Sequence, residues 1–121
     1  MDAGEWLVWA ITKDKSPDYI GSIVLWNYNS DQNKAELGYS LLATEQRRGY
    51  MQEALRVIIH YSFIGLNLEC LEAFTSVDNS PSLRLLQVLN FTREGEVLET
   101  LPSGIRMNLA SHKLLRGDYL K

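Results

Sequence analysis

A short basic loop with a central glycine is the segment of this sequence best suited to chemistry. The loop consists of Gln46, Arg47, Arg48, Gly49, Tyr50 and Met51. Gly49 allows close backbone approach and either sign of φ, so successive amides around it can converge on an anion at the start of a helix. Arg47 and Arg48 add cationic side chains for phosphates, one of which we expect to point to solvent. The loop therefore predicts a pyrophosphate site, and a solvated turn is the alternative for a pattern this short.

Strands must precede this loop and a helix must follow it. Three apolar, β-favouring segments separated by polar turn residues predict strands over residues 6–12, 19–28 and 35–42. Connections this short make the three strands antiparallel, because a parallel return needs a crossover. Residues 51–66 carry apolar side chains three or four apart, which predicts a helix with one broad apolar face and with Gly65 near its end.

A further strand and a second helix come next. Residues 68–75 alternate as a mostly buried strand, and the succession strand, helix, strand implies a parallel pairing. Residues 80–89 predict the second helix, with Pro81 suited to its first turn and Asn90 to the left-handed residue that ends it. The candidates for its N-cap are Asp78, Asn79 and Ser80.

The last two predicted strands, residues 92–100 and 105–112, form a hairpin around the turn at residues 101–104. The whole order β-β-β-α-β-α-β-β predicts an α+β fold with a mixed, mostly antiparallel sheet. We expect a ligand crevice at the parallel step, because diverging strands leave space beside a helix N-terminus. The unpaired N–H groups and positive partial charge of that terminus suit an anion.

Composition and charge exclude several classes of protein. The 121 residues suit one domain, residues 1–121, and the 45% hydrophobic and 22% charged fractions are those of a globular domain rather than a disordered chain. A net charge of −3 argues against a general nucleic-acid or anionic-membrane partner. Cys70, the one cysteine, leaves neither a disulfide nor a Cys/His cluster, so we expect no metal and a cytoplasmic location.

The order of these motifs resembles the GNAT superfamily of acetyl-CoA-dependent N-acetyltransferases. The resemblance rests on residues 36–42, on residues 46–54 and on the Asp, Asn, Ser, Leu and Phe positions within residues 78–91, and it spans about residues 19–112. The Rim-type ribosomal-protein N-terminal acetyltransferases are the most similar subgroup. The loop pattern of the family, Q/R-x-x-G-x-G/A, matches residues 46–51 except at Met51, and a methionine at that position is familiar in the Rim-like subgroup. The resemblance implies a GNAT-like sheet with acetyl-CoA as co-substrate.

The resemblance also implies roles for individual residues. The amides of the glycine loop would hold the pyrophosphate of acetyl-CoA. Leu41 and Leu42 would pair with the pantetheine arm and offer an amide to the thioester carbonyl. Asn79 and Ser82 would lie beside the pantetheine, with the Ser82 hydroxyl donating to the departing thiolate. The alternatives are a structural N-cap for Asn79 and an ordinary first-turn serine for Ser82.

Glu36 lies in the strand that leads to the predicted site and is the candidate general base. It would take a proton from the substrate ammonium, directly or through water. Its alternative is an exposed strand carboxylate on the other face of the sheet, since a register error of one residue reverses every side chain. The implied reaction is direct acetyl transfer to a primary amine, either a protein N-terminus or a small molecule.

The resemblance covers only part of the usual family domain. That domain begins with a further strand and one or two helices, which form much of the wall around the acceptor. We therefore expect an N-terminally shortened domain that forms a homodimer, because exposed sheet edges favour pairing with another chain. A non-catalytic CoA-binding or dimerisation module derived from the same fold is the alternative.

Overall fold

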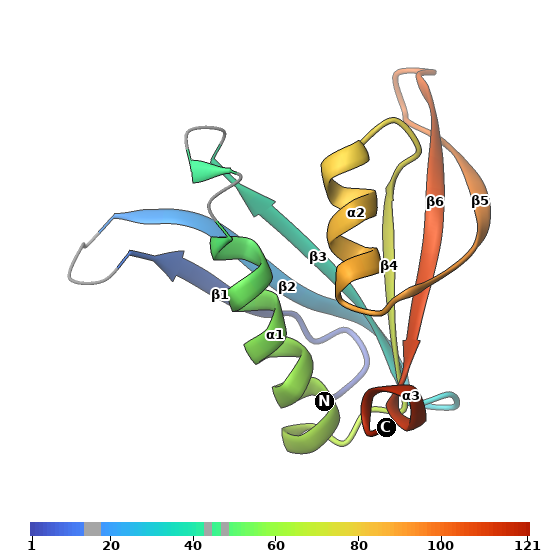
Figure 1. Cartoon of the computed structure of the whole chain (residues 1–121). Coiled ribbons are helices and arrows are strands. Elements are labelled where there is room, and N and C mark those ends of the chain that lie inside the picture. Colours follow the sequence, from blue (N-terminus) through green and yellow to red (C-terminus); the bar gives the residue numbers. More distant parts are fainter. Residues whose placement is uncertain (14–17, 43–44, 47–48) are drawn as a thin grey trace.

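The computed structural model describes residues 1–13, 18–42, 45–46 and 49–121. The described strands form one mixed sheet in the order β1-β2-β3-β4-β6-β5 (Figure 1). The strands are β1 (Leu7–Thr12), β2 (Tyr19–Asn29), β3 (Lys34–Leu41), β4 (Cys70–Ser76), β5 (Thr92–Thr100) and β6 (Arg106–Leu115). The helices are α1 (Tyr50–His60), its π-helical continuation η2 (Tyr61–Gly65), α2 (Ser80–Val88) and α3 (Arg116–Tyr119). The predicted α+β order and the GNAT-like mixed sheet are confirmed.

β3 and β4 form the parallel pair of the sheet, and they separate early. The crossover through α1 brings them side by side, whereas their outer neighbours β2 and β6 pair with them antiparallel. Their register partners are Lys34 with Cys70, Ala35 with Leu71 and Glu36 with Glu72. Beyond Glu36 and Glu72 the two strands, both fully described, diverge in a V (Figure 1). The sheet therefore opens toward the ends of β3 and β4.

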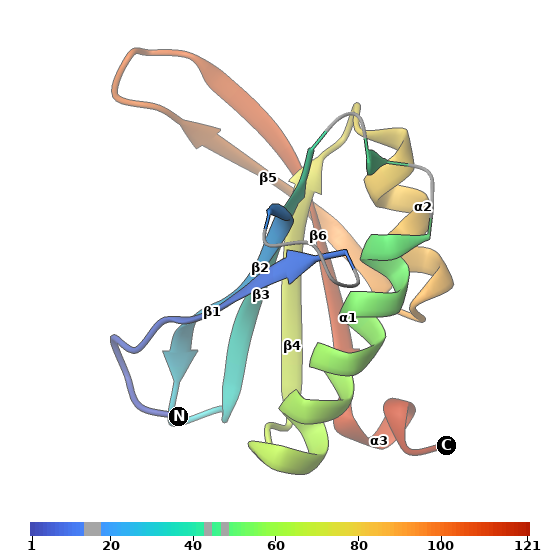
Figure 2. The ribbon, with the colours of Figure 1, turned by 90° about the vertical axis from the view of Figure 1, so that its left-hand side faces the viewer.

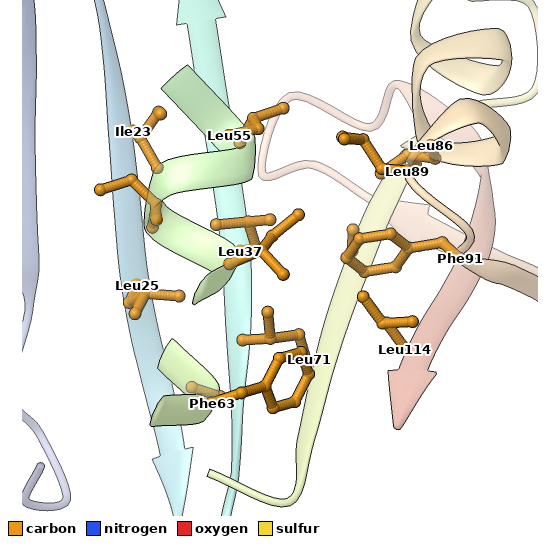
Figure 3. Packing of buried hydrophobic residues seen from close by; sticks show 14 of the residues in the cluster. Ile23, Leu25, Leu37, Leu55, Phe63, Leu71, Leu86, Leu89, Phe91 and Leu114 are labelled. Carbon is orange, nitrogen blue, oxygen red and sulfur yellow. The ribbon is translucent and has the colours of Figure 1, made fainter. Parts of the chain in front are cut away.

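The core lies between the sheet and the two longer helices, α1 and α2, which cover the same face (Figure 2). Apolar residues at helical spacing on α1 meet alternate residues of β2, β3 and β4 (Figure 3). Leu55 is fully buried there, so its truncation to alanine costs about 2–5 kcal/mol. No described helix covers the opposite face, where Trp6 is 62% exposed and Val8 63% exposed.

The end of the first helix differs in detail from the prediction. The helix predicted to Leu66 changes to a π-helical turn after His60, and that turn ends at Gly65. A Cβ on Gly65 would lie 2.6 Å from Cδ1 of Tyr61, so the glycine is required by the packing of that ring. The left-handed residue that follows is Asn67, with φ 58.

The C-terminal segment also extends beyond the prediction. β6 continues past His112 to Leu115, because Lys113–Leu115 still pairs with β4, and α3 was not predicted. A helix this short has no apolar periodicity to reveal it. It is held by contacts: the ring of Tyr119 stacks on Phe63 at 5.0 Å and its hydroxyl lies 2.6 Å from Nδ1 of His60. The predicted left-handed Asn90, with φ 69, is confirmed.

Candidate active site

An open groove occupies the region where β3 has left β4. Its volume is about 890 Å³, within the range of small-molecule sites. The end of β3, the beginning of α1 and the inner side of α2 form its walls. The lining residues are Tyr39, Ser40, Leu41, Gln46, Gly49, Tyr50, Met51, Gln52, Asn79, Ser80, Pro81, Ser82, Arg84, Leu85 and Val88. The structure thus brings together most of the predicted cofactor-binding residues that it describes.

The N-terminus of α1 opens into this groove without a side-chain cap among the described residues. Gly49 is the N-cap and has φ 79, a left-handed conformation that favours glycine. A Cβ at Gly49 would meet nothing within 4 Å, so the space beside it is open. The first backbone N–H groups of a helix have no partner within it. Those of α1, with the positive end of the helix dipole, are therefore suited to an anion in the groove.

The N-terminus of α2 is capped in contrast. Oδ1 of Asn79 accepts a hydrogen bond of 3.2 Å from the backbone N–H of Ser82, and a proline occupies the first turn. Of the three N-cap candidates, Asn79 is the residue that caps the helix. Because Asn79 also lines the groove, capping leaves its side chain beside the space where a ligand would lie. The two helix termini thus differ: within the part of the chain that the structure describes, no side chain caps α1, whereas Asn79 caps α2.

Tyr39 joins the two sides of the groove, and the sequence analysis assigned it no role. Its hydroxyl lies 2.6 Å from Oγ of Ser82, which links β3 to α2. Burial raises the pKa of the Tyr39 phenol, and the hydrogen bond to Ser82 partly opposes this. Tyr39 lies two residues before Leu41, so strand alternation places both on one face of β3. That alternation was the signal by which Tyr39 could have been found.

Leu41 and Leu42 have different surroundings, although both were predicted to contact the pantetheine arm. Leu41 lines the groove, whereas Leu42 is 53% exposed and outside the lining. The Leu42 N–H already donates to the carbonyl of Ile20 on β2, at 2.8 Å. Because N–H groups alternate in direction along a strand, those of Tyr39 and Leu41 point to the side that β4 has left. The Leu41 carbonyl accepts a hydrogen bond of 3.1 Å from Nε2 of Gln46.

The remaining loop residues are placed only in part. Arg47 and Arg48, the predicted phosphate cations, lie outside the described residues. Tyr50 lines the groove with Nζ of Lys13 at 5.8 Å from its ring centroid, and Met51 is buried at the junction of groove and core. Lining residues that the sequence analysis did not single out are Ser40, Gln52, Pro81, Arg84, Leu85 and Val88.

Glu36 lies outside the groove lining, on the face of the sheet that carries no described helix. It alternates with the core residues Ala35 and Leu37, so its side chain leaves the opposite side of β3. The carboxylate is half-buried and accepts a hydrogen bond of 3.3 Å from Nδ2 of Asn27. Burial raises the pKa of Glu36, and the nearby carboxylate of Glu72 acts in the same direction. Glu36 therefore stands where the V between β3 and β4 begins, facing away from the helices.

Within residues 1–13, 18–42, 45–46 and 49–121 there is no group of three His, Cys, Asp or Glu side chains that could hold a metal ion. Cys70 is buried in β4, as the sequence suggested, and His112 is buried in β6. In the same described segments, no helix is long and apolar enough to cross a membrane. The groove is thus the described feature that best accommodates a ligand.

Similarity to known proteins agrees with this geometry. Residues 1–92 match the acetyltransferase (GNAT) domain family. The uncharacterized N-acetyltransferase p20 of Bacillus licheniformis is 33% identical over 86 residues, which cover 71% of this chain and 48% of that protein. The putative ribosomal N-acetyltransferase YdaF of Bacillus subtilis (strain 168) is 28% identical over 100 residues, 82% of this chain and 55% of that protein. The chain spans about half the length of the curated relatives it matches.

Solved structures show the same fold. The crystal structure of a putative acetyltransferase superposes with a TM-score of 0.86 at 25% identity, covering 97% of this chain and 63% of that chain. A mutant of spermidine N-acetyltransferase SpeG from Vibrio cholerae gives a TM-score of 0.87 at 21% identity, covering 98% and 70%. At the latter identity the likeness concerns the fold alone. With a family match over three quarters of its residues and this sheet, the chain belongs to the GNAT acetyltransferase family.

Proposed function

We propose that the chain is an acetyl-CoA-dependent N-acetyltransferase domain that transfers the acetyl group directly to a primary amine. The observation that carries the proposal is the N-terminus of α1, which has no side-chain cap among the described residues and opens into a groove beside the part of β3 that has left β4. Such a terminus favours a pyrophosphate, and an extended arm can pair with the free edge of β3. Family membership supports the same assignment.

The residues in the groove fit the parts of acetyl-CoA. The amides around Gly49 and Tyr50 would hold the pyrophosphate, for which an open, positive helix terminus is available. The Leu41 N–H would stabilise the charge that develops on the thioester oxygen, while the Leu42 N–H is already engaged. Asn79 would lie beside the pantetheine arm. Acetyl-CoA itself supplies a carbonyl carbon that an amine can attack.

The acceptor would approach from the face on which Glu36 lies. There Glu36 takes one proton from the ammonium group and later returns it to solvent, and burial keeps it more basic than an exposed glutamate. The C–N bond forms as the C–S bond breaks, with its electron pair on sulfur. The Ser82 hydroxyl donates a hydrogen bond to that sulfur, which takes its proton from solvent. The attacking nitrogen loses a second proton to solvent as the amide forms. The ammonium thus loses two protons, of which one balances the proton gained by CoA and the other is released to solvent.

The class of acceptor follows from the relatives only in outline. One relative is called a putative ribosomal N-acetyltransferase and several structural neighbours are called spermidine N-acetyltransferases. From these names we infer that the acceptor of this chain is a primary amine, on a protein N-terminus or a small molecule. We also propose that the chain belongs with the Rim-type subgroup. A cytoplasmic location stays a prediction from composition.

Isothermal titration with acetyl-CoA tests the cofactor site. The wild type should bind saturably, and Gly49→Glu should weaken binding about tenfold or more, because a carboxylate beside the pyrophosphate repels it. Gly104→Glu is the matched control: Gly104 also has a positive φ, 90, and lies outside the groove lining, so it adds equal charge and similar strain without loss of affinity. Equal affinity of the wild type and Gly49→Glu would refute the assigned site.

A panel of amines then tests transfer. Release of free CoA in the presence of spermidine, a small primary amine or a peptide with a free N-terminus would support the acetyltransferase. Binding of acetyl-CoA without release of CoA on any acceptor would instead favour the non-catalytic module. Gly49→Glu should lower the release of CoA at subsaturating acetyl-CoA in parallel with its weaker binding. Release that this variant leaves unchanged would contradict the proposal.

We also propose a homodimer, on the basis of exposed apolar side chains at the sheet edge. β1 and β5 are the edge strands, and the β5–β6 hairpin exposes Val97, Leu98, Ile105 and Met107. Exposed apolar edges favour pairing with another chain. Light scattering at tens of micromolar should give about twice the chain mass of 13.8 kDa, and Leu98→Lys should reduce it. A wild-type mass near 13.8 kDa would exclude the dimer.

A further inference from the structure

The hydrogen bond between Tyr39 and Ser82 has an unusual position in the fold. It joins β3 to α2 where the sheet is open, since Tyr39 lies three residues past the last residue of β3 that pairs with β4 and Ser82 lies on α2. Both side chains line the groove. At 2.6 Å the bond is at the short end of the range for two hydroxyl groups. It therefore fixes the position of the Ser82 oxygen relative to β3.

The chemistry of the two groups assigns the direction of this bond. Burial raises the pKa of the Tyr39 phenol, so the phenol stays protonated and is available as a donor. A phenol is a better donor than an aliphatic alcohol because it is the stronger acid. When Tyr39 donates to Ser82 Oγ, the one hydrogen of the serine remains free for a second partner. Donation to an oxygen also strengthens the hydrogen bond that this oxygen's own hydrogen makes.

A serine in the first helical turn has a competing option. Its hydroxyl can turn back to a backbone group of its own helix, as serine side chains commonly do. The bond to Tyr39 holds the Ser82 oxygen on the side that faces β3 and the groove. Loss of the phenol hydroxyl would free Ser82 to rotate without removing any atom of the serine.

We propose that Tyr39 is a positioning residue, which donates to Ser82 Oγ and so directs the Ser82 hydroxyl hydrogen toward the sulfur of CoA. The inference rests on the proposed function and goes beyond it, because it assigns a role to a side chain that acts only through another. Tyr39 itself transfers no proton in this arrangement. Its effect is to make the hydrogen bond from Ser82 to the departing thiolate stronger and better aligned.

The pKa of the thiol of bound CoA measures this hydrogen bond without turnover. It can be followed by the ultraviolet absorbance of the thiolate as pH is raised in the presence of saturating protein. A donor to the thiolate lowers this pKa, so Ser82→Ala should raise it by about 1 to 2. Tyr39→Phe, which keeps the ring, should raise it by about 0.4 to 1. Tyr28→Phe is the matched control, because its hydroxyl bonds Asn33 at 2.9 Å outside the groove and should change nothing.

A double-mutant cycle separates positioning from a structural effect. If Tyr39 acts through Ser82, Tyr39→Phe should have almost no further effect on the thiol pKa in the Ser82→Ala protein. The rate constant kcat should follow the same pattern, with a loss of about 3- to 10-fold in the wild-type background and less than about 2-fold in Ser82→Ala.

Three outcomes would overturn the inference. Equal thiol pKa values in wild type and Tyr39→Phe would show that the phenol hydroxyl does not act on the thiolate. Additive effects of the two substitutions would show that Tyr39 acts independently of Ser82. Failure of the wild type to bind CoA would remove the proposed function together with this role, whereas the first two outcomes leave the proposed function standing.

Discussion

The cap of α2 offers a substitution series in which stability and cofactor affinity change separately. Oδ1 of Asn79 accepts from the Ser82 N–H, and alanine at this position removes that acceptor. Loss of an N-cap costs about 1 kcal/mol of folding free energy. For a chain of this length we expect a fall in Tm of roughly 4 °C. The helix also buries Leu86 against the core, so its fraying should appear in global unfolding.

Aspartate at the same position keeps the cap but changes the groove. A carboxylate caps as well as an amide, and its charge at a helix N-terminus adds about 0.3–1 kcal/mol of stability. Asn79→Asp should therefore be at least as stable as the wild type. It loses the amide N–H donor and adds negative charge to the groove wall, so acetyl-CoA affinity should fall. Asn79→Ala should bind about 2- to 12-fold more weakly, the value of one hydrogen bond.

Urea unfolding followed by circular dichroism measures the stability of the three proteins, and isothermal titration measures their affinity for acetyl-CoA. We expect Asn79→Ala to be less stable than the wild type and to bind acetyl-CoA more weakly. Asn79→Asp should bind acetyl-CoA more weakly without a loss of stability. An aspartate variant as unstable as the alanine variant would refute the capping argument. Affinity equal to that of the wild type in both variants would show that Asn79 only caps the helix.

Three further substitutions follow from individual side chains. Glu36→Gln should lower kcat about 10²- to 10⁴-fold and remove an acidic limb of the pH–rate profile, which burial should place above the usual glutamate pKa of 4.5. Burial lowers the pKa of His112 below 6.5, so the unfolded chain takes up a proton there before the folded chain does. The free energy of unfolding should therefore fall as the pH drops below 6.5. Urea titrations at about pH 7.5 and pH 5 should show this loss in the wild type and in the control His60→Gln, but not in His112→Gln. Gly65→Ala should cost about 1–3 kcal/mol because its Cβ would meet the ring of the tyrosine four residues earlier, whereas Gly117→Ala, with open space around it, should be nearly neutral by the same urea assay.

The features that could be predicted from the sequence are those set by residues a few positions apart. The apolar period of α1, the turn at residues 101–104 and the left-handed Asn90 all depend on neighbours within a few positions, and each is confirmed. The parallel pairing of β3 and β4 followed from connection length in the same way. The short helix α3 was missed because contacts with Phe63 hold it, and such contacts leave no periodic trace in the sequence.

The site was predictable in its parts and less so in its arrangement. Asn79, Ser82 and the glycine loop were identified, and the structure gathers the first two and the described residues of the loop around one groove. The alternation of side chains along β3 determines the positions of the other two residues. It turns Glu36 away from the helices and places Tyr39 in the groove. Which face of the sheet a side chain lies on depends on the exact strand register, and a single sequence does not fix that register. Alternation with Leu41 pointed to Tyr39, but its contact with Ser82 joins residues 43 positions apart and needed the structure.

Two carboxylates lie at the point where β3 and β4 separate. Glu36 and Glu72 are register partners on the same face, and like charges directly opposite each other oppose pairing. Nζ of Lys34 lies 2.8 Å from Oε1 of Glu72, whereas Glu36 accepts its hydrogen bond from Asn27. Burial is the main cause of the raised pKa of Glu36, and the carboxylate of Glu72 adds to it. The two carboxylates thus lie where the sheet opens, and the burial that raises the pKa of Glu36 supports the role of base that we propose for it.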